Sequence, residues 1–295
     1  MRILNLIGFI FLFIISIPTA YCENFTIVPI NKNHKQQMTS LKTWTEGCPV
    51  ILDRLRVVKF SYYDFDGKEH QNGEIVVLDA VSERVLSIFK ELHNIKFPIA
   101  KAYPIEHYDG NDEKSMLDNN SSSYNCREIT GGGLPSIHSY GLAIDINPIQ
   151  NPYISFNEPN EEHAKILPSS GKDYINRTNM RPGMAEYIID IFKKNGFTIW
   201  GGKWNTPIDW QHFQIPRTLA QLLAVMSFND GKEFFNMVIN TQSKIFETIK
   251  IEDNKFVQLY QKSPEKFIKV FRANKNIFEM EPSKAIRIVE LQISL

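Results

Sequence analysis

Three residues of metal-ligating types, two histidines and one aspartate, limit the folds that this chain can adopt, because all three must meet at one place. His138 and Asp145 are seven positions apart, and His212 follows much later in the chain. Two histidines and one carboxylate are a sufficient set of protein ligands for a catalytic zinc ion, which keeps a fourth position open for water. We therefore expect a fold in which the strand carrying Asp145 lies beside a strand that carries His212.

Two neighbouring features support this interpretation. Gly141 and Ala143 are small residues between the first two ligands, and we expect them to let the backbone pass close to the metal. On a strand, Ala143, Asp145 and Asn147 would share one face. Asp209 precedes His212 by three residues and is placed to face a metal-bound water without being a ligand. A carboxylate in that position can take a proton from the water and pass it to the leaving amine.

Other ionisable residues have simpler explanations. A single histidine is usually hydrogen-bonded or exposed, whereas the pattern S-x-H-x-x-G-x-A-x-D at 136–145 seldom arises by chance. The tryptophans Trp200, Trp204 and Trp210 are expected either in the core or in a pocket wall. The histidines that have no partner at ligand spacing are His34, His70, His93, His107 and His163. The acidic residues expected to be solvated loop charges are Asp109, Asp112 and Glu113.

Composition excludes several classes of protein. Lys plus Arg equals Asp plus Glu, at 33 each, so no excess charge favours binding to nucleic acid. Three cysteines are too few for a disulfide-dense scaffold or a multi-cysteine zinc framework. The apolar fraction of 43% is ordinary for a globular protein with a substantial core.

The first 22 residues predict a secretory signal peptide. A basic start is followed by an apolar run over 3–17 and by small residues that include Ala20. Cleavage is expected after Ala20 or after Cys22, which makes the protein exported, periplasmic or extracellular. An uncleaved anchor is the alternative, but the run is shorter than the roughly 20 residues that span a bilayer. Tyr21 disfavours a lipoprotein, and we expect no stable membrane span after cleavage.

Periodicity predicts an α+β fold, an antiparallel sheet with packed helices. Strands are expected over 56–64, 74–78 and 97–105, with turns at Asp66-Gly67 and Asn72-Gly73. Apolar spacing predicts a helix from 81 to 92 and another from about 185 to 192 that stops near Gly196. The polar stretch 108–124 is expected to be a long loop.

The segment 217–295 changes character. Apolar residues recur there at helical spacing, and Ser263-Pro264 resembles a helix start. The segment contains no His and no Cys. It is therefore expected to be a helical extension without chemistry of its own, whose protein partner, if any, the sequence does not identify.

The stretch 46–216 resembles the zinc D-alanyl-D-alanine carboxypeptidase family, whose fold is shared with the Hedgehog signalling domain. Within that family it is most similar to the branch with phage L-alanyl-D-glutamate endopeptidases. The segments that carry the resemblance are 47–50 (GCPV), 65–68 (FDGK), 115–116 (SM), 119–120 (NN), 124–127 (YNCR), 136–148 and 197–213.

The resemblance implies roles for individual residues. It makes His138, Asp145 and His212 ligands of Zn²⁺ and makes Asp209 the catalytic base. Arg127 matches the arginine that steadies the oxyanion of the tetrahedral intermediate. Together with the patterns at the two ends of the chain, which lie outside the resemblance, it divides the chain into four expected parts: a signal peptide (1–22), a lead-in (23–45), a zinc peptidase domain (46–216) and a helical extension (217–295).

The function expected from these features is an exported zinc metallopeptidase acting on peptidoglycan stem peptides. The loops around the pocket decide whether it trims a terminal D-Ala as a carboxypeptidase or cuts an L-Ala–D-Glu bond as an endopeptidase. The alternative is a zinc-containing binding or signalling module, or a secreted effector, that uses the same fold without cell-wall hydrolysis. Asp209 disfavours this alternative, because a purely structural zinc needs no base.

Two cysteines remain once the signal peptide is removed, Cys48 and Cys126. An even count in an exported protein favours a disulfide, with two buried free thiols as the alternative. A bridge would tie down the loop that presents Arg127, because Arg127 adjoins Cys126.

Overall fold

The computed structural model describes residues 25–130, 132–156 and 164–295. The predicted signal peptide and His163 lie outside the described residues. Within the described parts of the chain, the search for membrane-spanning segments finds no helix with the length and apolar character to cross a bilayer.

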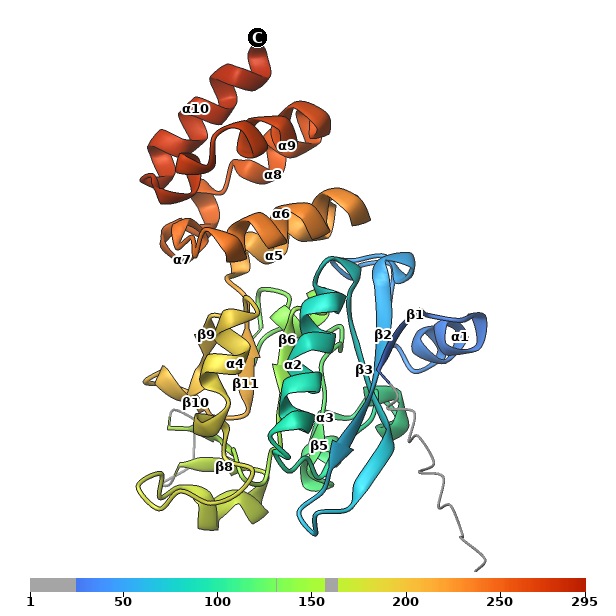
Figure 1. The fold of residues 1–295 in the computed structure, drawn as a ribbon. Helices are drawn as coiled ribbons and strands as arrows, with labels where there is room; N and C mark the ends of the chain where they lie inside the picture. The colour runs from blue at the N-terminus through green and yellow to red at the C-terminus, as the bar shows by residue number, and fades with distance from the viewer. Residues whose placement is uncertain (1–24, 131, 157–163) are drawn as a thin grey trace, which may run out of the picture.

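The N-terminal half is built on an antiparallel sheet of order β1-β2-β3, covered by one long helix (Figure 1). Val85, Ile88 and Leu92 form the buried face of that helix and pack it against the sheet. Buried apolar residues at helical spacing account for this packing. The elements of this half are β1 (Thr26–Pro29), α1 (Lys32–Ser40), β2 (Leu55–Tyr63), β3 (Glu69–Leu78) and α2 (Ser82–Asn94).

The predicted hairpin is confirmed, but one predicted turn is wrong. The chain turns at Gly67, which has a positive φ of 76°. Asn72-Gly73 instead lies inside β3, where Gly73 pairs with Phe60 of β2. A Cβ at Gly73 would lie 2.6 Å from the Phe60 ring, which stacks on Phe89 of α2. Gly73 therefore makes room for an aromatic core residue rather than for a turn.

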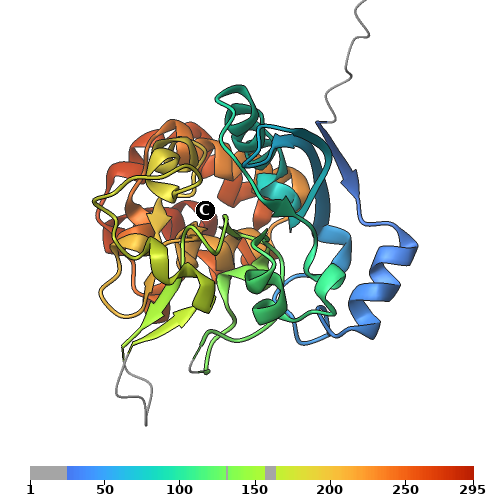
Figure 2. The ribbon, with the colours of Figure 1, turned by 90° about the horizontal axis from the view of Figure 1, so that it is seen from below.

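The region that follows consists of short strands joined by ordered loops. Two antiparallel sheets have the orders β6-β11-β9 and β10-β7-β8, and β4 pairs with β5 in parallel. Figure 2 shows β7 and β8 on the opposite side of the molecule from the N-terminal sheet. The elements are β4 (Lys101–Ala102), α3 (Asp112–Leu117), β5 (Asn120–Ser121), β6 (Ala143–Asp145), β7 (Tyr153–Ser155), β8 (Lys165–Leu167), α4 (Ile189–Lys194), β9 (Ile199–Trp200), β10 (Ile208–Asp209) and β11 (His212–Gln214).

The α+β class is thus confirmed, while several element boundaries differ from the prediction. The strand expected over 97–105 is reduced to β4, and the loop expected over 108–124 contains α3 and β5. α3 has a local cause, because the Asn111 side chain accepts a hydrogen bond from the Lys114 backbone N–H and caps the helix. The predicted helix near 185–192 is a 3₁₀ turn followed by α4, and Gly196 ends it with a φ of 93°.

The segment after Pro216 is helical, as predicted, and stacks on one end of the rest of the chain (Figure 1). Its core is aromatic, with Phe234 in ring contact with Phe246, Phe267, Phe271 and Phe278. The helices are α5 (Arg217–Val225), α6 (Phe228–Asn240), α7 (Ile245–Thr248), α8 (Phe256–Lys262), α9 (Pro264–Ala273) and α10 (Pro282–Ser294).

A partly buried arginine joins the helical segment to the N-terminal sheet. Arg54 forms a bidentate ion pair with Asp79, through bonds of 2.7 and 2.8 Å. Its guanidinium also donates to backbone carbonyls at the end of α5, including that of Met226. Arg84 of α2 donates to the Asn236 side chain of α6. The extension is therefore packed on the domain through specific polar contacts as well as apolar ones.

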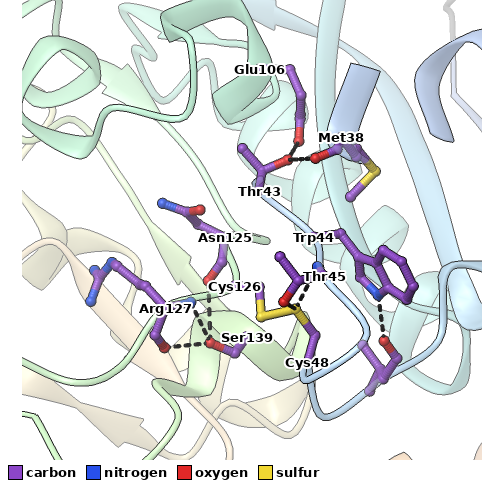
Figure 3. Close-up of a disulfide and its surroundings, with 11 residues drawn as sticks. Met38, Thr43, Trp44, Thr45, Cys48, Glu106, Asn125, Cys126, Arg127 and Ser139 are labelled. Carbon is purple, nitrogen blue, oxygen red and sulfur yellow. Dashed lines mark hydrogen bonds between the residues drawn. A yellow bond between two sulfur atoms is a disulfide. The ribbon is translucent and has the colours of Figure 1, made fainter. Parts of the chain in front are cut away.

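Cys48 and Cys126 form a disulfide, as favoured by the sequence, with their Cα atoms 6.0 Å apart. Figure 3 shows the bridge beside Arg127, whose backbone N–H donates to the Ser139 hydroxyl over 2.9 Å. The Cys126 backbone N–H donates to the Thr43 carbonyl over 3.0 Å. The bridge and these bonds fix the segment that leads to Arg127.

Candidate metal centre

Three side chains predicted as metal ligands converge in the structure. His138 Nε2 lies 3.1 Å from His212 Nδ1, and the two nitrogens lie 3.3 and 3.0 Å from carboxylate oxygens of Asp145. Within the described residues, these three side chains form the group of His, Cys, Asp and Glu residues that lie close enough together to hold a metal ion. Its three residues come from one 3₁₀ turn and two adjacent strands, 74 positions apart at the extremes.

In each imidazole ring, the nitrogen that faces away from the cluster has a hydrogen-bond partner, and this partner shows which nitrogen carries the hydrogen. His138 Nδ1 donates to the Ser123 carbonyl over 2.5 Å, and His212 Nε2 donates to Gln214 Oε1 over 2.8 Å. In a neutral imidazole, one ring nitrogen carries the hydrogen and the other carries the lone pair. His138 Nε2 and His212 Nδ1 therefore point lone pairs at each other and at a carboxylate. Such a convergence is repulsive unless a cation lies between the groups, so the donor set fits a zinc ion.

The electrostatics of the cluster agree with this arrangement. Burial would raise the pKa of Asp145, but attraction to the His138 and His212 rings in their protonated form holds its pKa well below its usual range. Burial lowers the pKa of His212, whereas the Asp145 carboxylate, which accepts a hydrogen bond from the protonated ring, raises it, and the net pKa is raised. The carboxylate is thus ionised, and the pocket stabilises positive charge between the two rings.

Strand pairing explains why these residues meet. In the β6–β11 pair, His212 is directly opposite Asp145, and Gln214 is opposite Ala143. Directly opposite residues have their side chains on the same face of the sheet. This register confirms the expected neighbouring strands. Asn147 does not continue the strand, because its φ is 46° and its side chain bonds to the Pro98 carbonyl and the Ala100 backbone N–H.

Gly141 is small for a different reason from the one predicted. A Cβ at this position would lie 2.6 Å from the Leu78 backbone nitrogen at the end of β3. The Gly141 carbonyl accepts a hydrogen bond from that nitrogen, and the residue has a φ of 66°. Gly141 thus lets the turn that carries His138 lie against β3, whereas the expectation was close approach to a metal.

Asp209 lies on β10 beside the cluster. Burial and the nearby charge of Asp145 raise the pKa of Asp209 to about 6. Its Oδ1 is shielded from solvent and has no hydrogen-bond partner among the described residues. A Cβ at Gly201 would lie 2.5 Å from the Asp209 carbonyl, so the glycine allows β10 to approach. A carboxylate with a raised pKa and a free oxygen is suited to accept a proton from water.

Arg127 lines the same cavity but is already paired. Its Nε forms an ion pair with Asp112, and its Nη1 donates to the Glu128 carbonyl over 3.1 Å. Asp112 was expected to be a solvated loop charge, and the structure instead places it in the cavity wall. The guanidinium therefore faces the same cavity as the cluster and is held in position by a neighbouring carboxylate.

The cavity around the cluster has a volume of about 650 Å³, which is in the range of small-ligand sites. The Trp204 ring forms part of its wall and lies 5.4 Å from the His212 ring. Trp200 instead donates its indole N–H to the Trp210 carbonyl and packs against the core. The structure thus separates the pocket-wall tryptophan from the structural ones.

Sequence reasoning missed three residues of this site: Ser123, Gln214 and Arg217. Gln214 was detectable, because a residue two positions after a ligand on a strand shares its face. Ser123 acts through its backbone carbonyl, which carries no sequence signal. Arg217 begins α5 and was assigned to the helical extension, yet it lines the cavity.

Three histidines outside the cluster have carboxylate partners, in agreement with the prediction that they are not ligands. His34 lies 3.4 Å from Glu106, His70 lies 2.6 Å from Asp64 and His93 lies 2.8 Å from Glu69. His107 stacks on the Tyr103 ring.

Comparison with known proteins adds one match. A family model described as D-alanyl-D-alanine carboxypeptidase matches residues 130–215. The match supports a peptidase. It covers less than a third of the 295 residues, but it contains the three clustered residues and Asp209. Arg127 lies just before it and the helical segment just after it. No curated protein and no solved structure matched the chain.

Proposed function

We propose that this protein is an exported zinc metallopeptidase that hydrolyses peptide bonds in peptidoglycan stem peptides. The observation that carries the proposal is the convergence of two imidazole lone pairs and the Asp145 carboxylate beside Asp209. The match to a D-alanyl-D-alanine carboxypeptidase model supports both the reaction class and the substrate. We further propose the Hedgehog/DD-peptidase fold for residues 46–216 and a helical extension for 217–295.

Each residue of the cluster has a distinct task in this proposal. His138, Asp145 and His212 would hold the zinc ion, while Ser123 and Gln214 orient the two rings. When bound, zinc would polarise the scissile carbonyl and lower the pKa of water. Asp209 accepts the proton of the attacking water and delivers it to the leaving amine.

Arg127 would offset the negative charge that develops on the carbonyl oxygen. It comes from the segment fixed by the Cys48–Cys126 bridge, and Asp112 holds its Nε. Because Asp112 holds Nε, the pairing also fixes the orientation of the other N–H groups of the planar guanidinium. Such an oxyanion donor can contribute about 3 kcal/mol to lowering the barrier.

Export is part of the proposal because stem peptides are found outside the cytoplasm. Its sequence basis is the predicted signal peptide over 1–22. Detection of the mature N-terminus near residue 21 or 23 in the exported fraction would support it. A protein that retains Met1 and remains in the cytoplasm would contradict it.

Metal content and substrate turnover test the two halves of the proposal separately. Elemental analysis should find about one zinc per chain in the wild type and much less in His138→Ala. His70→Ala is a matched control, because His70 pairs with Asp64 away from the cavity and should retain the metal. Equal zinc in all three proteins would contradict the ligand assignment.

Mass spectrometry of muropeptides incubated with the mature protein identifies the bond that is cut. Loss of a terminal D-Ala would show a carboxypeptidase, and cleavage between L-Ala and D-Glu would show an endopeptidase. Zinc-loaded protein that cuts neither bond would overturn the peptidase proposal and leave a binding module or secreted effector as the function.

A further inference from the structure

Arg217 is an arginine in the cavity wall that forms no ion pair with any carboxylate of the described residues. Its Nη1 donates to the Pro135 carbonyl over 2.7 Å. A guanidinium has five N–H donors, and within the described residues no other acceptor and no ion pair involves Arg217. The side chain is half-buried, and burial lowers the pKa of Arg217. A desolvated cation without a counter-charge is costly, which indicates a site prepared for an anion.

The contrast with Arg127 is informative. Both arginines line the cavity, but Arg127 has a carboxylate partner, since its Nε pairs with Asp112. Arg217 follows His212 by five residues, at the point where β11 leads into α5. It lies against Pro135, on the segment that leads to the 3₁₀ turn carrying His138. Arg217 is therefore attached to both parts of the chain that supply the histidines.

The start of α5 adds positive potential at the same place. α5 begins at Arg217 after Pro216, has no side-chain cap and has no acidic residue in its first turn. The first backbone N–H groups of a helix lack intrahelical acceptors and favour an anion. The start of α5 therefore adds to the positive potential around Arg217 and supplies no acidic side chain that would neutralise it.

We propose that Arg217 is a specificity-determining residue that binds a carboxylate of the peptide substrate. This inference rests on the proposed peptidase function and names the feature of the substrate that the site selects. Arginine is suited to this role because its planar N–H pairs match a carboxylate in a bidentate way. A stem peptide offers two such groups, the terminal carboxylate of D-Ala and the α-carboxylate of D-Glu. The helical extension would then contribute its first residue to the site.

Peptide binding to the full-length mature chain, loaded with zinc and carrying Asp209→Asn to prevent turnover, tests the proposal. One pair of probes is an acyl-L-Lys-D-Ala-D-Ala peptide with a free terminus and its C-terminal carboxamide. The second pair is L-Ala-γ-D-Glu-L-Lys with a free D-Glu α-carboxylate and its α-carboxamide. Dissociation constants from titration calorimetry are compared before and after Arg217→Gln is added.

Arg217→Gln should weaken binding of the carboxylate peptide in one pair by about ten- to hundredfold, and should leave its carboxamide within about twofold. The pair that shows this selective loss identifies which carboxylate is bound. Arg217→Lys should recover part of the loss, because it restores charge without the planar fork. Arg272→Gln is the matched control, since Arg272 is an exposed arginine of the same extension paired with Glu233, and it should change nothing.

Equal weakening of the carboxylate and carboxamide peptides would show a structural role and overturn the inference. The inference would also be overturned if Arg217→Gln left the binding of every peptide unchanged, or if the zinc-loaded chain bound neither pair of peptides. Failure of the proposed function is detected separately, as absence of hydrolysis by the wild type. Hydrolysis without carboxylate preference would leave the peptidase standing and remove Arg217 from its specificity.

Discussion

The region that holds the metal cluster and the helical extension are built in opposite ways. Around the cluster, strands are two or three residues long, and hydrogen bonds to a loop carbonyl (Ser123) and to a side chain of β11 (Gln214) hold the two histidine rings. In the extension, α6 and α10 each run for 13 residues around a core of phenylalanine rings. The cluster region therefore relies on contacts between distant parts of the chain, and the extension relies more on local helix formation.

The two regions therefore obtain their stability from different sources. A helical segment with a continuous apolar face can form much of its structure from near neighbours in sequence. Three-residue strands cannot, so β6 and β11 depend on the surrounding sheet, the disulfide and the fit of Gly141 against β3. We expect substitutions in the cluster region to affect turnover. Substitutions at the contact between the extension and the N-terminal sheet should affect the stability of both regions.

The largest expected effect is on catalysis alone. Asp209→Asn should lower turnover of muropeptides about 10³-fold, because the substituted amide cannot accept the proton. Zinc content and the unfolding midpoint should remain near those of the wild type, as Asp209 lies outside the ligand cluster. Turnover within a few-fold of the wild type would show that another group is the base.

Loss of the disulfide should destabilise the cluster region more than the extension. Replacing Cys48 and Cys126 by Ser removes a bridge across 78 positions, which the chain-entropy model values at about 4 kcal/mol of unfolding free energy. Turnover should fall more than zinc content, because the bridge fixes the segment before Arg127. Hydrogen exchange can resolve the two regions, and equal deprotection of α6 and β6 would contradict the regional difference.

Arg54→Met tests how strongly the extension is joined to the sheet. Arg54 and Asp79 are 13% and 0% exposed, and removing one partner of a buried pair costs about 3 kcal/mol. The matched control is Lys232→Met, which breaks the exposed pair with Glu83 across the same joint and should cost less than about 1 kcal/mol. Chemical denaturation of both variants gives the comparison. Equal small effects would show that apolar contacts alone hold the extension.

The pH dependence of turnover should show an acid limb due to Asp209. Its pKa is raised to about 6 by burial and Asp145, and a bound zinc ion would lower it through its positive charge. The base must be ionised, so kcat/KM should rise tenfold per pH unit below that pKa and level off above it. Zinc content measured across the same range separates this limb from metal loss. A flat profile between pH 4 and 6 with zinc retained would argue against Asp209 as the base.

The helical extension shows what local pattern can predict. Apolar spacing alone predicted helices after Pro216, and Ser263-Pro264 marked the start of α9. The hairpin of β2 and β3 was predicted in the same way from β-branched and aromatic residues. Gly73 was misread as a turn because a glycine required by the Phe60 ring looks the same in sequence as one required by a turn.

The candidate site was predicted only in part. Residue types and spacing identified the three clustered side chains and Asp209, since each carries chemistry in its own side chain. α3 was not predicted within the stretch 108–124, because this short helix depends on a cap formed by a single asparagine, Asn111. The role of Gly141 was misassigned, because its neighbour Leu78 is distant in sequence.

The side chains able to bind a metal, the helices after Pro216 and the two cysteines able to pair can all be recognised from residue types and their spacing. The place of Arg217 in the cavity, the contacts of Arg54 between the two regions and the pairing of Asp112 with Arg127 become visible only in the folded chain. The two kinds of property differ in the sequence separation of the residues that produce them. Side-chain chemistry and helical periodicity are local properties, whereas burial, ion pairing and strand register depend on which distant residues become neighbours.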